Sequence, residues 1–328
     1  MSAKTKNVQH NKKQQLNQQE VDIWPLIIIG FGPAGYNASL YASRYKIKHL
    51  VIGQLIGGQI SKAHLVENYL GFPQITGPEI AQKFREHAKK FMQVSDSKEV
   101  FDTVTNILKQ QDIFVLQTAS GKQYKAYTVI LAIGTKEQEL GLPNEKKFIG
   151  RGVSYCATCD GFFFRDKVVG VVGGSDTANT ASLYLVGLAK EVHQFVRSSL
   201  KGERIWHDQI KQNPKIKLHI GVKVEELIGA ERLEAVKLSD GTEVKLDGLF
   251  VEIGSYPDLS IVQNLKLETD ERGYIKVNSR QETNLPGFYA AGDITTASNY
   301  FRQLITSAAE GAIAANSVLE YLSKMQVI

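Results

Sequence analysis

The two cysteines of this chain, Cys156 and Cys159, are the only ones in 328 residues, and two residues separate them. Thiols at this spacing can form a disulfide that is reduced reversibly, or they can contribute half of a metal site. A zinc site needs about four ligands, and the seven histidines show no ligand-like grouping, so we predict no metal. A pair of buried, unreactive cysteines is the other alternative. Asp160 favours redox chemistry, because a carboxylate beside a dithiol can move a proton.

Length and composition indicate a globular protein with two domains, since 43% of the residues are hydrophobic and 22% are charged. The net charge of +5 is modest, and no basic cluster is interleaved with aromatics, so we expect no nucleic-acid partner. No apolar run approaches the length of a membrane span or a signal peptide. Two cysteines in a long chain fit a reducing cytosol, so we expect a cytoplasmic protein. Residues 1–21 are rich in Lys, Gln and Asn, and we expect a disordered tail.

A glycine-rich turn follows a short apolar run near the start of the chain. Residues 26–29 predict a buried parallel strand, residues 30–35 have the pattern G-x-G-x-x-G, and residues 34–44 have helical spacing. These glycines permit a tight turn and a close approach to a pyrophosphate, which then faces the start of the helix. The next strand, residues 49–52, is followed by Gly53 and Gln54, where an acidic ligand for a ribose is expected.

A second unit of the same kind lies about 140 residues further on. Residues 168–172 predict a strand, residues 173–178 a glycine-rich turn, and the helix that follows is expected to run through Leu188. Between the two units we predict a helix over residues 77–91 and antiparallel strands over residues 100–108 and 113–118. A strand is predicted at residues 129–132 and a last helix over residues 303–325. The fold class is therefore α/β with two Rossmann-like domains.

Together these motifs resemble the low-molecular-weight thioredoxin reductases, FAD-containing members of the pyridine nucleotide–disulfide oxidoreductases, over residues 24–325. Residues 156–161 match the redox motif of that family letter for letter. The resemblance implies an FAD site formed by the first glycine turn, two flavin-side segments, the end of a central strand and the start of the last helix. Its residues would be Gly30, Gly32, Pro33, Ala34, Gly35, Gly58, Gln59, Asn68, Ala132, Gly134, Gly292, Asp293, Arg302 and Gln303.

The resemblance also implies a domain organisation. An FAD domain would be split into residues 22–137 and 249–328, and a second nucleotide domain, residues 138–248, would be inserted between the halves. The second domain would carry the cysteines, rotate on two connecting strands, and alternate between the flavin and a protein substrate. Members of the family are usually homodimers, so a homodimer is expected here.

Catalytic roles follow from the same resemblance. Cys159 would face the flavin, and Cys156 would attack the disulfide of thioredoxin or a thioredoxin-like protein. Asp160 would exchange protons with these thiols. A dithiol oxidase that passes electrons from FAD to oxygen is an alternative function. The complete match over residues 156–161 and the retained Arg302 and Gln303 favour the reductase. The presence of Cys156, Cys159 and Asp160 together disfavours a flavin-binding protein without enzymatic activity.

The second nucleotide site departs from the family pattern. Gly173, Gly174, Asp176 and Thr177 keep it, but Ser175 replaces the third glycine and Thr180-Ala181 replace an acidic pair. The cluster His-Arg-Arg-x-x-x-Arg, which binds the 2′-phosphate of NADPH, is represented by residues 196–202, with Arg197 as its single arginine and Lys201 as a substitute. Two alternatives stay open. The site binds NADPH or NADH more weakly, or another reduced carrier such as ferredoxin, a flavin or a deazaflavin supplies the electrons.

Overall fold

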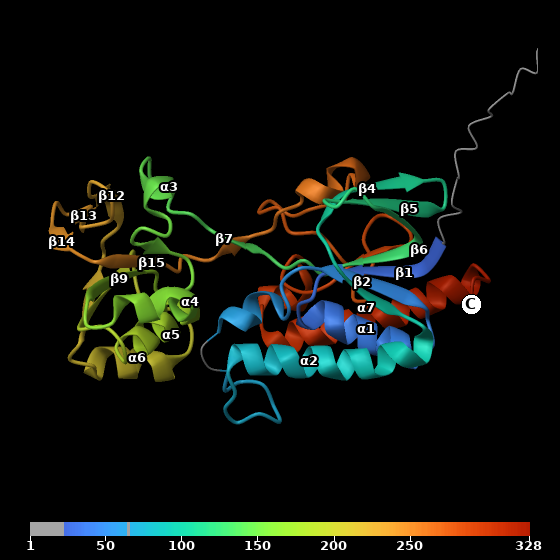
Figure 1. Cartoon of the computed structure of the whole chain (residues 1–328), viewed down its shortest axis with the longest axis horizontal. Coiled ribbons are helices and arrows are strands. Elements are labelled where there is room, and N and C mark those ends of the chain that lie inside the picture. Colours follow the sequence, from blue (N-terminus) through green and yellow to red (C-terminus); the bar gives the residue numbers. More distant parts are fainter. Residues whose placement is uncertain (1–22, 64–65) are drawn as a thin grey trace, which may run out of the picture.

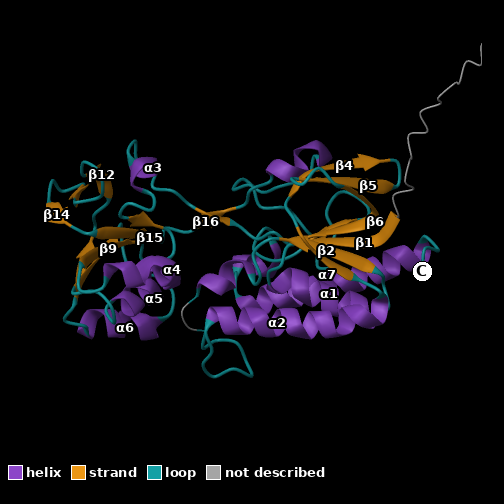
Figure 2. Cartoon of the chain, viewed as in Figure 1, coloured by secondary structure: helices purple, strands orange, loops and turns teal. Residues whose placement is uncertain are grey.

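The computed structural model describes residues 23–63 and 66–328 and consists of two α/β lobes (Figures 1 and 2). The expected tail, residues 1–21, lies outside the described residues. The two Rossmann-like sheets confirm the predicted fold class. In Figure 1 the larger lobe, on the right, contains both ends of the described chain, and the smaller lobe, on the left, is formed by its middle part.

The larger lobe has a seven-stranded sheet with the order β3-β2-β1-β6-β5-β4, in which β17 also pairs with β6. Strands β1, β2, β3, β6 and β17 are parallel, whereas β4 and β5 are antiparallel. The strands are β1 (Ile23–Ile29), β2 (His49–Gly53), β3 (Lys98–Phe101), β4 (Val104–Gln110), β5 (Ile113–Thr118), β6 (Gln123–Leu131) and β17 (Phe288–Ala290). The helices are α1 (Pro33–Arg44), α2 (Gly77–Met92) and α7 (Leu304–Lys324), with short 3₁₀ turns η1 (Gly58–Lys62), η2 (Gln93–Ser95), η4 (Ser260–Leu265) and η5 (Ala297–Tyr300).

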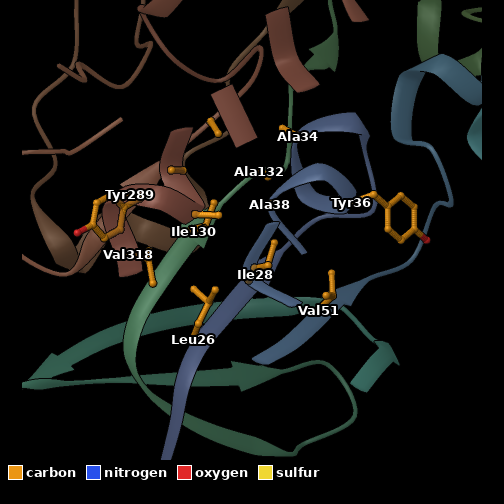
Figure 3. Close-up of a cluster of buried hydrophobic side chains, with 14 of the residues drawn as sticks. Leu26, Ile28, Ala34, Tyr36, Ala38, Val51, Ile130, Ala132, Tyr289 and Val318 are labelled. Carbon is orange, nitrogen blue, oxygen red and sulfur yellow. The ribbon is translucent and has the colours of Figure 1, made fainter. Parts of the chain in front are cut away.

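The apolar run in β1 is buried on both faces of this sheet, as predicted. Leu26 and Ile28 pack with α1 and α7 in one core, which includes Val318 (Figure 3), whereas Ile27 and Ile29 pack in a second core on the opposite face. This alternation is the period of two of a strand, and burial on both faces explains why the sequence is apolar at every position.

The segment predicted as one strand over residues 100–108 is two strands. β3 ends at Phe101 and runs parallel to β2, while β4 begins at Val104 and pairs with β5. At the break, the amide of Asp102 donates to the carbonyl of Gly53, and its carboxylate accepts hydrogen bonds from Thr103 and Ser120. These contacts end the parallel pairing and turn the chain into the antiparallel hairpin.

The smaller lobe has a parallel sheet with the order β11-β10-β9-β15-β8 and a separate antiparallel sheet, β12-β13-β14, which the sequence analysis did not predict. Helix α5 ends at Leu185, three residues before the expected end, because a turn over Tyr184 to Leu188 follows it. Strand β15 pairs with β9, so the sheet of this lobe extends beyond the expected boundary at residue 248. The strands are β8 (Val153–Ser154), β9 (Val168–Val172), β10 (Glu191–Val196), β11 (Ile216–Ile220), β12 (Val224–Ile228), β13 (Ala235–Leu238), β14 (Glu243–Lys245) and β15 (Gly248–Val251). The helices are α3 (Glu145–Phe148), α4 (Ala157–Asp160), η3 (Gly161–Phe164), α5 (Asp176–Leu185) and α6 (Arg204–Gln212).

Two short antiparallel strands, β7 (Lys136–Glu137) and β16 (Ser255–Tyr256), connect the lobes. The chain enters the smaller lobe through β7 and leaves it through β16 (Figures 1 and 2). An ion pair between Lys136 and Asp258 and a hydrogen bond of 2.8 Å from Thr135 Oγ1 to Ser255 Oγ support this connection. Because only two residues of each strand pair, few contacts restrain the lobes at this point.

Candidate active site

A cavity of about 1620 Å³ lies between the lobes, and most of the residues predicted from the sequence line it. This volume exceeds the range of about 300–1,000 Å³ for ordinary small-molecule sites and suits an extended dinucleotide. The larger lobe contributes the first glycine turn, the segments around Gln59 and Asn68, and Asp293, Arg302 and Gln303. The smaller lobe contributes Cys156 and the start of α5.

The glycines of the first turn have different physical roles. Gly30 has φ +121°, and a Cβ there would lie 2.2 Å from the carbonyl oxygen of Ala132. A Cβ on Gly35 would lie 2.0 Å from the carbonyl oxygen of Gly30. By contrast, a Cβ on Gly32 would meet no protein atom within 4 Å, although Gly32 lines the cavity. Gly30 and Gly35 therefore let the chain pack closely. Gly32 leaves the start of α1 open to a ligand, as the pyrophosphate of FAD requires.

Asp293 lines the cavity beside α7. Burial raises the pKa of its carboxyl, and a hydrogen bond of 2.8 Å from Ser307 Oγ together with the charge of Arg302 opposes this rise. Glu310 on the same helix holds the preceding turn, since its Oε2 accepts a hydrogen bond of 2.8 Å from the amide of Gly292. Burial raises the pKa of Glu310 as well. Both acids therefore lie in an enclosed environment where a bound polar group is held strongly.

Arg302 and Gln303 lie where the last helix begins. The Arg302 guanidinium lies 3.8 Å from the centroid of the Tyr274 ring, and its Nε donates to the carbonyl of Asp293 at 3.2 Å. Its Nη2 is buried and has no hydrogen-bond partner among the described residues. Asn68 donates to Gln303 Oε1 at 3.1 Å, so these two residues, both predicted to lie beside the flavin, contact each other. An unpaired buried donor at the cavity wall fits a ligand that accepts hydrogen bonds, such as the isoalloxazine ring.

Cys156 and Cys159 form a disulfide, which confirms a pair that can be oxidised and reduced. Cys156 is the N-cap of the four-residue helix α4, and the amide of Cys159 donates to its Sγ at 3.2 Å. Ser154 connects the pair to the nearby acid: its Oγ accepts from the amide of Cys156 at 3.0 Å and donates to Asp160 Oδ2 at 2.7 Å. Asp160 is therefore held beside the disulfide.

The orientation of the pair differs from the expected one. Cys156 lines the cavity, whereas Cys159 is exposed and does not line it. The Thr158 hydroxyl donates to the carbonyl of Lys62 in the larger lobe. In this arrangement Cys159 is turned away from the cavity that contains the expected flavin site. Its assignment as the flavin-facing thiol therefore stays a prediction for another position of the smaller lobe.

The sequence matches the family model for pyridine nucleotide-disulphide oxidoreductases over residues 24–312. The chain belongs to this FAD-containing family. It is 38% identical to the thioredoxin reductase of Bacillus subtilis (strain 168), over 94% of this chain and 97% of that protein. It is therefore a thioredoxin reductase-type disulfide oxidoreductase with a Cys-x-x-Cys redox pair.

Two solved structures of thioredoxin reductases are similar to this one. The enzyme of Lactococcus lactis in the FR conformation has a TM-score of 0.87 and 31% identity, with 92% of this chain and 99% of that chain covered. A ferredoxin-flavin thioredoxin reductase of Clostridium acetobutylicum has a TM-score of 0.50 and 32% identity, with 92% of this chain and 98% of that chain covered.

The second glycine turn is hydrogen-bonded to the loop that follows β10. Gly174 accepts a backbone hydrogen bond of 2.6 Å from Lys201. Asn179 Nδ2 donates to the carbonyl of Lys201 at 3.0 Å, and the amide of Glu203 donates to Asp176 Oδ1 at 2.7 Å. The loop where the sequence analysis expected the 2′-phosphate therefore packs against the turn. Arg197, Ser198, Ser199 and Lys201 lie on it, all exposed.

Three residues of this thioredoxin reductase-type site were missed by the sequence analysis: Glu310, Ser307 and Glu252. A glutamate in the apolar face of α7 is a signal for Glu310, because charged residues are rarely buried without a role. The same signal applies to Glu252, which interrupts the apolar run at residues 249–253. Within residues 23–63 and 66–328, no group of three or more His, Cys, Asp or Glu side chains could hold a metal ion. No helix in the same ranges is long and apolar enough to cross a bilayer.

Proposed function

We propose that this protein reduces the disulfide of thioredoxin or a thioredoxin-like protein, and that a reduced carrier other than NADPH supplies its electrons. Ferredoxin is the first candidate for this carrier. The flavin would be held by the first glycine turn, Asp293, Arg302 and the meeting of Asn68 with Gln303. When bound, FAD would pass two electrons to the Cys156–Cys159 disulfide.

The residues of the smaller lobe would then carry the exchange reaction. The Cys156 thiolate attacks one sulfur of the partner disulfide, forms a mixed disulfide and releases the other partner sulfur as a thiolate. Asp160 gives that thiolate a proton. The Cys159 thiolate next attacks Cys156 Sγ, which restores the internal disulfide and releases the second partner thiolate. Because a thioredoxin has a reduction potential near about −270 mV, the electron donor must be at least comparably reducing.

The observation that carries the proposal on the donor is the geometry of Gly202. This residue occupies the position of the last arginine in the family's phosphate-binding cluster. Its φ is +90°, and a Cβ there would lie 1.9 Å from Asp176 Oδ1. An arginine here would be strained by the positive φ, and the Asp176 carboxylate would have to move to admit its Cβ. Losing two arginine–phosphate contacts, each worth on the order of 1.5–3 kcal/mol, would weaken NADPH binding roughly 10²- to 10⁴-fold.

The arrangement of the lobes supports a moving smaller lobe. The two solved relatives cover the same 92% of this chain, yet their TM-scores are 0.87 and 0.50. Different placements of two lobes with the same fold produce such a difference. The short strands β7 and β16 are the only paired segments that join the lobes within the described chain. A rotation there would move Cys159 relative to the flavin and let either cysteine face the cavity.

Anaerobic stopped-flow reduction of the bound flavin tests the donor. NADPH, NADH, reduced ferredoxin and dithionite are mixed in turn with the FAD-loaded protein, and flavin bleaching is followed near ~450 nm. We expect fast reduction by ferredoxin and slow, weakly saturating reduction by both nicotinamides. Efficient reduction at micromolar NADPH would contradict the proposal. Rapid oxygen consumption with dithiols, without thioredoxin reduction, would instead favour a dithiol oxidase.

Two double variants test whether the missing family residues weaken NADPH binding. The double variant Ser175→Gly/Ser198→Arg restores one glycine and one arginine of the family pattern, and we expect about a tenfold gain in apparent NADPH affinity. The matched control, Ser175→Gly/Ser199→Arg, has the same charge at a position that the family does not use. An equal gain in both double variants would show that net charge, and not the specific contact, is responsible.

Single cysteine variants test the assigned roles. Cys156→Ser leaves Cys159, which we expect to give a long-wavelength charge-transfer band with oxidised FAD. Cys159→Ser leaves Cys156, which we expect to trap a mixed disulfide with a thioredoxin that keeps only its attacking cysteine. If the two variants exchange these properties, the roles of the two cysteines are reversed. Cys156, which lines the cavity in this position of the smaller lobe, would then be the flavin-facing thiol.

A further inference from the structure

Glu252 is an acidic side chain in the wall of the cavity that none of the roles described above uses. It directly follows β15 and stands between Val251 and Ile253 in an apolar run. It lines the same cavity as Cys156, Ala157 and Thr158. In the parallel pairing of β15 with β8, Phe250 lies opposite Ser154, and Glu252 and Cys156 each come two residues after these paired positions. Its backbone is fixed, because the glycine at position 173 packs so closely that a Cβ there would lie 2.2 Å from the Glu252 carbonyl oxygen.

The cation near this carboxyl, Lys62, is already paired with a carboxylate. The pKa of Glu252 is raised to about 8, mainly by burial and further by Glu137, although the Ala157 amide and Lys62 oppose the rise. Lys62 is already paired with Glu137, and Lys136 is paired with Asp258. The neighbours of Glu252 are thus a carboxylate on β7, a lysine on η1 that is already paired, and the first turn of the redox helix. A carboxyl in such a place keeps its proton at neutral pH.

We propose that Glu252 is a positioning residue for the redox pair and that its carboxyl, held at the amide following Cys156, controls when the reduced Cys156 carries a negative charge. Two negative charges in one poorly solvated place repel each other. A Cys156 thiolate therefore favours a protonated Glu252, and an ionised Glu252 favours a Cys156 thiol. The two groups titrate as a coupled pair, with two apparent steps that belong to both.

This coupling belongs to the smaller lobe. Glu252 follows β15 and Cys156 precedes α4, and both elements are part of that lobe, so a rotation on β7 and β16 moves them together. Lys62 lies in the larger lobe and would be left behind. Glu252 would then lose the one cation that lowers its pKa. Its proton would be held more tightly whenever the redox pair leaves this position, and the thiolate needed for attack would be favoured there. The inference holds for any electron donor, because it concerns only the reduced pair.

Alkylation kinetics of the reduced, FAD-loaded protein test the coupling of Glu252 to Cys156. The protein is reduced with dithiothreitol, desalted anaerobically and treated with iodoacetamide between about pH 5.5 and 10, and Cys156 is identified by peptide mass spectrometry. The alkylation rate reports the thiolate fraction. For the native chain, we expect the alkylation rate of Cys156 to rise with pH in two steps. In Glu252→Gln, which keeps the shape and an acceptor for the Ala157 amide, we expect one step with a midpoint about one pH unit lower.

Two further variants keep the result unambiguous. Glu252→Asp retains a carboxyl and should retain two steps. Glu243→Gln removes an exposed carboxylate on β14, in the same lobe but outside the cavity lining, and should match the native profile. Superimposable profiles for the native chain and Glu252→Gln, both with unchanged flavin content and thermal stability, would overturn the proposal. If Glu252→Gln fails to fold, a profile of Glu252→Asp with a single step would overturn it equally.

Discussion

Helix α7 crosses helix α1 at Gly311, and adding one methyl group there should destabilise the larger lobe. An ideal Cβ at position 311 would lie 2.0 Å from the carbonyl oxygen of Ala34 and 3.0 Å from its Cα. Since these are backbone atoms, no side chain can move aside, and α7 must retreat by more than about 1 Å to reach an ordinary contact. Overpacking of this kind costs typically 1–3 kcal/mol.

Helix propensity alone predicts that the substitution at position 311 stabilises the protein. Replacing a glycine inside a helix by alanine stabilises the helix by about 1 kcal/mol. With the overpacking cost near its upper limit, the net result for Gly311→Ala is a loss of about 1–2 kcal/mol. In a chain of this size that corresponds to a fall in Tm of roughly 3–6 °C. Because Ala34 lies in the first glycine turn, the variant should also retain less FAD after purification.

Thermal melts followed by circular dichroism and by flavin fluorescence measure both effects. Ala309→Gly is the matched control, because position 309 is exposed on the same helix. It should lower the stability by about the propensity difference alone, about 1 kcal/mol, without altering the flavin content. A higher Tm for Gly311→Ala, equal and opposite to the change in the control, would refute the close crossing of the two helices.

Three other predictions concern buried polar groups. Glu310→Gln weakens the acceptor that holds the Gly292 amide, so it should lower stability by about 1–3 kcal/mol and release FAD more easily, as measured by Tm and flavin retention. Burial lowers the pKa of His49 from 6.5 to about 4, so stability should fall as the pH drops from 6.5 toward 4, by up to about 1.4 kcal/mol per pH unit. Urea unfolding at several pH values should give a shallower slope for His49→Gln, and an unchanged slope would contradict this. Thr158→Val removes the hydroxyl that donates to the Lys62 carbonyl, so hydrogen exchange at residues 58–62 should be faster; equal rates would show that this contact does not hold the lobes.

The sequence predicted the elements whose signals are local. Residues 26–29 and 168–172 are apolar at every position because both faces of their strands are buried, and each run is followed by a glycine turn that the backbone requires. The disulfide followed from the spacing of two cysteines and an adjacent acid. In each case one short segment contains both the signal and its physical reason.

The missed features depend on contacts between distant segments. The division of residues 100–108 into two strands is set by Asp102, whose partners are Gly53 and Ser120. The position of Glu310 in the apolar face of α7 is a signal of a buried role, but its partner, the amide of Gly292, comes from a distant segment. The exposure of Cys159 depends on the position of one lobe relative to the other. No periodicity in the sequence contains this information.

The larger lobe is completed by the last part of the chain, which has a consequence for its synthesis. Strand β17 adds to the edge of β6, and α7 packs on α1, so residues 288–324 finish a core that begins at residue 23. The smaller lobe is continuous from β8 to β15 and leaves the ribosome earlier. At translation rates of about 5–20 residues per second, the strands up to β6 stay without their complete core for roughly 10–40 s while the inserted lobe already folds. Asp293 and Arg302 are also made late, so if they hold the flavin as we propose, we expect only a nearly complete chain to retain it.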